Sequence, residues 1–219
     1  MRRFLRENGL SVALFALFLF SLIGQSVAGW HTFNDDQRAH GAPLLGYPRY
    51  LGSGHFIEAV FENWESEFLQ MGAFVLMTVA LRQKGSSESK PLTEGKSPPA
   101  KAGRRSRNAP LPVRRGGWLL RIYENSLSIA LTLLFVLSFS LHAIGGAAEE
   151  NRERLLHREA RVSVGEYAGS SKFWFESFQN WQSEFLSVGV LIVLSIFLRQ
   201  KGSPQSKEVA EPHAKTGTD

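Results

Sequence analysis

The sequence predicts an all-α integral membrane protein with four transmembrane helices, arranged as two tandem helical hairpins that repeat in parallel. The first observation is a pair of long apolar segments, residues 10–29 and 126–146, which contain no charged side chain. A bilayer core about 30 Å thick needs roughly 20 residues of helix, and both segments reach that length. The mean hydropathy of −0.12 is modest because polar segments dilute the apolar ones.

The second observation is an internal repeat. The sequence FENWESEFL at residues 61–69 returns as FQNWQSEFL at residues 178–186, and LRQKGS at residues 81–86 returns at residues 198–203. Upstream, ENGLSVAL at residues 7–14 returns as ENSLSIAL at residues 124–131. Because the displacement is the same at both ends, a whole structural unit is duplicated.

The repeat sets the expected boundaries of the domains and spans. The first copy covers residues 1–83, with spans at about 10–29 and 62–82, and the second covers residues 118–201, with spans at about 124–146 and 180–199. Residues 1–28 also have the pattern of a cleavable signal peptide. We prefer a retained helix because the same pattern recurs inside the chain, where no signal peptide can lie. Gly72 and Gly189 are matched positions at which helices could pack closely.

The polar segments between and after the copies predict orientation and partners. Residues 84–117 and 202–219 are rich in Ser, Pro, Lys and Gly, which predicts a disordered basic linker and a disordered tail. Basic residues beside spans favour the cytoplasmic side, so both termini and the linker are expected there. The linker lacks aromatic residues for base stacking, which argues against nucleic acid and favours anionic lipid headgroups as its partner.

Several polar residues near the outer ends of the spans are candidates for a site. Trp64 and Trp181 begin their spans and are expected to anchor at the membrane interface. The candidate outer polar cluster contains Gln25, Asn63 and Glu67 of the first copy and His142, Asn180 and Glu184 of the second. We expect Gln25 to approach Glu67 and His142 to approach Glu184, either as structural bridges or as a functional cluster.

Other polar residues point to no chemistry. Glu58, Glu62 and Glu65 are not repeated in the second copy, which predicts a solvated helix face. The absence of cysteine excludes disulfides and thiolate catalysis, and the histidines of residues 31–55 lack zinc-site spacing. No phosphate loop or nucleophile motif occurs, so we expect no catalytic, cofactor or metal site.

The repeated motifs resemble a bacterial family of small membrane proteins that is catalogued as a domain of unknown function. The resemblance covers most of both halves, and it implies an inner-membrane location but no activity. Three hypotheses follow: a non-enzymatic structural or stress-related component, which we prefer; a small transporter or channel, as a homo-oligomer; and an enzyme that uses Glu67 and Glu184.

Overall fold

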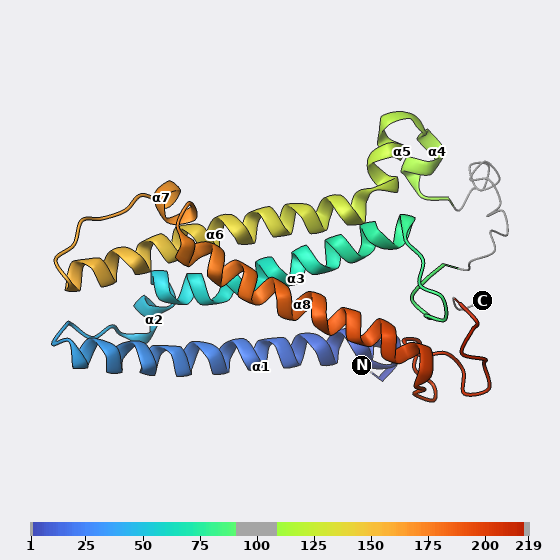
Figure 1. Cartoon of the computed structure of the whole chain (residues 1–219), viewed down its shortest axis with the longest axis horizontal. Helices are drawn as coiled ribbons and strands as arrows, with labels where there is room; N and C mark the ends of the chain where they lie inside the picture. Colours follow the sequence, from blue (N-terminus) through green and yellow to red (C-terminus); the bar gives the residue numbers. More distant parts are fainter. Residues whose placement is uncertain (1, 91–108, 217–219) are drawn as a thin grey trace. The chain divides into compact units, whose positions relative to one another are not determined.

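The computed structural model describes residues 2–90 and 109–216, and every regular element in these ranges is a helix (Figure 1). The helices are α1 (Arg2–Ala39), α2 (Tyr47–Tyr50), α3 (Gly54–Ala80), α4 (Leu111–Arg115), α5 (Gly117–Glu124), α6 (Ser126–Leu156), α7 (Val164–Ala168) and α8 (Ser171–Phe197).

Three helices in the described part of the chain are long and apolar enough to cross a membrane, namely α1, α6 and α8. The expected fourth span, in α3, does not meet the same criterion of length and composition. The reason lies in its first half, where Glu58, Glu62, Glu65 and Glu67 lower the hydropathy. Composition therefore supports a membrane protein, and the fourth span needs a separate argument.

The helices extend beyond the expected spans. Helix α1 continues to Ala39 and α6 to Leu156, about three turns past the apolar segments. Two residues after each helix, the chain passes through a residue with positive φ, Gly41 at 64° and Arg158 at 61°. These are matched positions, at an offset of 117 residues that equals the offset from Phe61 to Phe178. A left-handed residue is a common way to end a helix, and here the second copy uses a non-glycine residue for it.

The described chain divides into two compact units. Unit 1 contains Met1–Glu62 and Ser140–Trp174, and unit 2 contains Asn63–Phe139 and Phe175–Asp219. Each unit therefore contains parts of both sequence copies, and helices α3, α6 and α8 each pass from one unit into the other.

In unit 1, one asparagine per copy holds the loop that follows α1 or α6. Asn34 donates to the carbonyl of Leu45 (2.9 Å) and accepts from its amide (2.8 Å). Asn151 makes the same two bonds to Val162, at 2.9 and 2.8 Å. The backbone groups of these loops are thus satisfied at matched positions, as buried polar groups require.

A tyrosine then packs on a glycine in each copy. A Cβ atom on Gly29 would collide with the hydroxyl of Tyr50, and one on Gly146 would collide with the hydroxyl of Tyr167. Burial, with Glu149 and Tyr47 nearby, raises the pKa of Tyr50 to about 12. Tyr50 therefore stays neutral at physiological pH, where its hydroxyl bonds the Nδ1 atom of His55 (3.0 Å).

Helices α3 and α6 approach each other closely in unit 1. A Cβ on Gly54 would lie 2.7 Å from the carbonyl oxygen of Gly145, and one on Gly145 would lie 2.6 Å from the amide of Glu58. The sequence-based expectation named other glycines, and it was wrong. A Cβ on Gly72 would make only an ordinary contact with Leu131 (3.6 Å), and a Cβ on Gly189 would meet no atom of the described chain within 4 Å.

In unit 2, the same turn follows α3 and α8. The amide of Gln83 donates to Ser89 Oγ, and the amide of Gln200 donates to Ser206 Oγ, both at 2.9 Å. Gly85 and Gly202 have φ values of 85° and 82°, which a side chain would strain. The repeated LRQKGS motif thus encodes a repeated turn.

The tail forms turns as far as Thr216. In these turns the buried ammonium of Lys207 donates to the carbonyls of Pro212 (3.3 Å), His213 (2.9 Å) and Lys215 (3.1 Å). The expected disorder of residues 202–219 stays a prediction. Of the expected linker, residues 91–108 lie outside the described chain, while residues 111–115 form α4.

The asparagine bonds predict a local contribution to stability. Asn34→Ala should lower the free energy of unfolding by about 1–3 kcal/mol, because the Leu45 amide loses its acceptor in a buried setting. Thermal unfolding of the detergent-solubilised protein measures the loss. Asn8→Ala is the control, since the exposed Asn8 side chain bonds only the Phe4 carbonyl of its own helix. Equal stability of the two variants would contradict the prediction.

Candidate functional site

The residues expected at the outer ends of the spans fall in both units. Gln25 is in unit 1, where its Nε2 atom donates to the carbonyl of Ala59 (3.4 Å). His142 is also in unit 1 and is fully buried. The expected approach of Gln25 to Glu67, and that of His142 to Glu184, stay predictions.

Glu67 and Glu184, the matched glutamates, are both in unit 2. They lie near enough for their charges to interact. Glu67 is exposed and Glu184 is half-buried, while Asn63 is exposed and Asn180 donates to the Glu176 carbonyl of its own helix (3.2 Å). The structure thus brings the two equivalent carboxylates together.

Glu65 is a buried carboxylate that the sequence reasoning missed. Its side chain is fully buried, and its Oε1 atom accepts hydrogen bonds from Ser177 Oγ (2.8 Å) and from the indole nitrogen of Trp181 (3.3 Å). The prediction of a solvated face was therefore wrong at this position. Trp181, expected as an interfacial anchor, uses its polar atom inside unit 2.

The mismatch between the copies explains the error. Gln182 matches Glu65 and is exposed, so Glu65 did not look like part of the repeated plan. Ser177, one of the two donors to Glu65, is matched by Val60, which has no side-chain donor. The sequence did contain a signal for this contact. Glu65 on α3 and Ser177 on α8 are polar residues whose matched positions in the other copy, Gln182 and Val60, hold different side chains.

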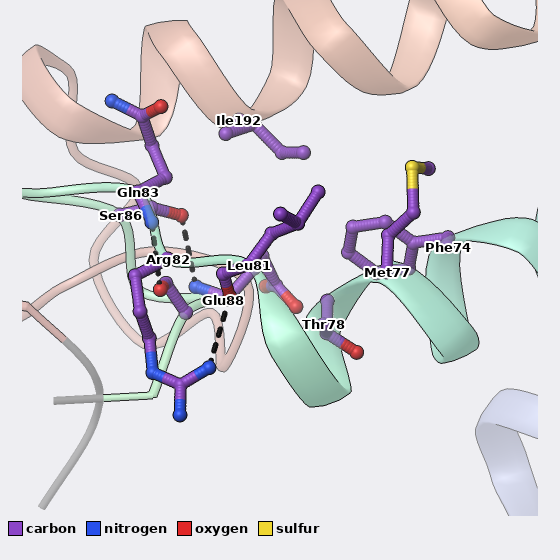
Figure 2. A pocket seen from close by; sticks show the side chains of 10 residues that line it. Phe74, Met77, Thr78, Leu81, Arg82, Gln83, Ser86, Glu88 and Ile192 are labelled. Carbon is purple, nitrogen blue, oxygen red and sulfur yellow. Dashed lines mark hydrogen bonds between the residues drawn. The ribbon is translucent and has the colours of Figure 1, made fainter.

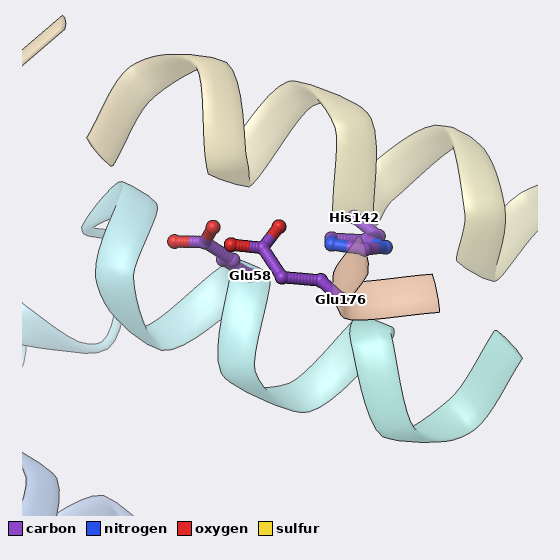
Figure 3. Close-up of side chains that lie close together, drawn as sticks. All are labelled: Glu58, His142 and Glu176. Carbon is purple, nitrogen blue, oxygen red and sulfur yellow. The ribbon is translucent and has the colours of Figure 1, made fainter. Parts of the chain in front are cut away.

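Unit 1 contains a second buried polar group, around Glu58 of α3 (Figure 3). The hydroxyl of Tyr167 donates to Glu58 Oε1 (2.9 Å), and a ring nitrogen of His142 on α6 lies within 4.8 Å of a Glu58 oxygen. The His142 ring packs on Phe173 with centroids 4.7 Å apart. Glu58 was also expected on a solvated face, and it is half-buried with a side-chain donor.

An arginine cluster joins α1 and α6 at the end of unit 1 that carries the loops. Arg152 of α6 donates to the buried Glu149 (2.6 and 2.9 Å), to Asp36 (3.3 Å) and to Gln37 (2.7 Å). Its guanidinium also lies over the Phe33 ring, 4.7 Å from the centroid. A planar guanidinium suits this mixture of carboxylate, amide and aromatic partners.

Both carboxylates have side-chain hydrogen-bond donors. Glu65 receives bonds from a hydroxyl and an indole, and Glu58 receives one from a phenol, which offsets the cost of burying their charge. The expected absence of catalytic, cofactor and metal sites stays a prediction.

The glycine contact between α3 and α6 gives a sharp prediction. Gly145→Ala should lower the free energy of unfolding by about 1–3 kcal/mol, because its new methyl group would press on the Glu58 backbone. Thermal unfolding in detergent measures the change. Gly24→Ala is the matched control, since a Cβ at Gly24 meets no atom within 4 Å. A Gly145→Ala protein as stable as the Gly24→Ala protein would refute the close contact.

Comparison with known proteins identifies a family but no activity. No curated protein and no solved structure matches the chain. The family model described as a domain of unknown function (DUF6766) matches residues 1–218, almost the whole chain. The chain therefore belongs to the DUF6766 family.

Proposed function

We propose that this protein is a non-enzymatic, multi-pass component of the bacterial inner membrane, with a structural or stress-related role. In this proposal two tandem hairpins give four spans. The observation that carries it is the repeated set of structural bonds: the Asn34 and Asn151 bonds in unit 1, and the Gln83 and Gln200 turns in unit 2. Polar groups at both sets of helix ends form hydrogen bonds that hold the loops and turns in place.

Helix α3 serves as the fourth span in this proposal. Its second half, from Phe68 onward, is almost entirely apolar. Its most buried glutamate, Glu65, accepts hydrogen bonds from side chains of α8. A paired carboxylate turned into the protein lowers the cost of placing α3 in lipid. The two halves then become equivalent hairpins, and an even number of spans per copy gives both the same orientation.

The basic residues favour cytoplasmic termini. Two basic residues, Arg82 and Lys84, follow α3 next to the basic linker. Two more, Arg199 and Lys201, follow α8. This side would face the anionic lipid headgroups of the inner leaflet. A homo-oligomer is compatible with the large apolar side chains that α1 exposes.

The topology can be tested by reporters at three places. A fluorescent protein that folds only in the cytoplasm should be active when inserted at residue 100. Alkaline phosphatase, active only outside, should work at residues 42 and 161. Phosphatase activity at residue 100 would overturn the orientation, and equal reporter activity at residues 42 and 100 would remove α3 as a span. Because a cleaved first helix leaves the linker cytoplasmic, the mass of the mature chain is measured as well.

A transporter or channel is the second candidate, favoured by the buried polar groups Glu65 and His142 in a chain of membrane-length helices. An enzyme that uses Glu67 and Glu184 is the third, because the two carboxylates lie near each other. Purified protein in liposomes separates the first two proposals.

For the structural role, the flux of protons, sodium or potassium should equal that of protein-free liposomes. Ion flux that Glu65→Gln abolishes, in protein that stays folded, would establish the transporter instead. The enzyme is tested in a deletion strain with a defined growth defect. Complementation by the Glu67→Gln/Glu184→Gln protein at normal membrane levels is expected, and its failure would favour catalysis.

A further inference from the structure

A cavity of about 230 Å³ lies at the end of α3 in unit 2 (Figure 2). Its wall is apolar and comes from Phe74, Met77 and Leu81 of the helix end and from Ile192 of α8. Its rim is polar and comes from the turn after α3, including Arg82, Gln83, Ser86 and Glu88. One side of the cavity thus suits hydrocarbon, and the other suits a hydrated polar group.

A second cavity of about 280 Å³ lies at the end of α8, also in unit 2. Its lining residues are Leu191, Leu194, Ser195, Leu198, Arg199, Gln200, Ser203, Gln205 and Ser206. Each of them is matched, 117 residues earlier, by a residue that lines the first cavity. The repeat therefore reproduces a hollow as well as a turn.

The hollow depends on the fold of the turn. The Gln83–Ser89 and Gln200–Ser206 bonds, with Gly85 and Gly202 at positive φ, bend the chain back beside the last helical turn. One arginine lines each rim, Arg82 in the first copy and Arg199 in the second. Each rim thus offers a cation next to an apolar wall.

The two arginines differ in how far their donors are used. Within residues 2–90 and 109–216, Arg82 donates hydrogen bonds only from its Nη1 atom, to the carbonyls of Val79 and Leu81. Arg199 uses Nη1 on helix-end carbonyls, Nε on the backbone carbonyl of Glu208 and Nη2 on that of Glu211. Arg82 therefore keeps donors for a ligand, while Arg199 contributes charge from a fixed position.

We propose that each cavity binds one phospholipid with an anionic headgroup, its upper acyl chain along the apolar wall and its phosphate at the basic rim. The proposal rests on the membrane location in the proposed function. Both cavities are smaller than the roughly 300–1,000 Å³ of typical small-molecule pockets, so each would hold part of an amphiphile whose remainder stays in the bilayer. A free phosphate would leave the apolar wall wet.

The copies differ in charge at one rim position. Glu88 lines the first cavity, and Gln205 replaces it in the second. Arg82 lines the first rim together with this opposing charge. Removing a like charge a few ångströms from a phosphate should strengthen binding about fivefold, since such pairs near a surface interact by about 1 kcal/mol or more.

Native mass spectrometry of the full chain in detergent tests the proposal. With added phosphatidylglycerol we expect two retained lipids per chain, and with phosphatidylcholine fewer. Glu88→Gln should raise the affinity of the first cavity about fivefold, and Gln205→Glu should lower that of the second cavity by a similar factor. Glycerol phosphate, which carries the headgroup without chains, should not displace the lipid.

Blocking variants test the location of the sites. Thr78→Trp fills the first cavity and should remove one lipid, and Ser195→Trp should remove the other. Leu76→Trp is the control, because Leu76 is exposed and lines neither cavity. Equal retention of phosphatidylcholine, displacement by glycerol phosphate, or two lipids on the Thr78→Trp protein would each overturn the proposal. If Thr78→Trp does not fold, an unchanged affinity in Glu88→Gln refutes it alone.

These outcomes are independent of the topology experiment. Reporters decide the number and direction of spans in cells, whereas lipid retention is measured on purified protein. A chain with three spans could still bind two lipids, and a chain with four spans could bind none.

Discussion

The contact between the backbones of α3 and α6 is the constraint on which most of unit 1 depends. Gly54 and Gly145 have no room for a Cβ, so the two helices meet without intervening side chains. In lipid, where apolar side chains gain little from leaving their surroundings, such close packing is a main source of helix association. It also places Glu58 of α3 beside His142 of α6, and next to the Tyr167 hydroxyl.

The two copies divide the work between shared and divergent positions. Shared residues build the frame: Asn34 and Asn151 hold loops, Tyr50 and Tyr167 cover glycines, and Ser89 and Ser206 close turns. Divergent residues supply polar contacts between the two copies.

Two polar contacts between the copies use a residue that the other copy lacks. Glu65 with Ser177 corresponds to Gln182 and Val60, and Arg152, which contacts Asp36, corresponds to Asp35. A contact between equivalent elements needs unlike partners, because two identical carboxylates repel each other when buried. Duplication followed by divergence at facing positions produces such pairs, and Glu67 with Glu184 shows what remains where no divergence occurred.

The sequence by itself determined the helical class and the repeat, because these follow from apolar length and from the repeated motifs. It located α3, α6 and α8 to within a few turns, and the cation-rich ends after Ala80 and Phe197. The asparagine bonds are local as well, since each joins a residue 11 positions along its own chain segment.

Only the tertiary structure decided which side chains are buried. The burial of Glu65 depends on Ser177 and Trp181, more than a hundred residues away, and no local pattern carries that information. The close glycines proved to be Gly54 and Gly145, which are not matched to each other in the repeat, because the crossing joins a helix of one copy to a helix of the other. The turns of the tail have the same cause: the carbonyls that accept bonds from Lys207 come together only when the chain folds back, and composition carries no information about that.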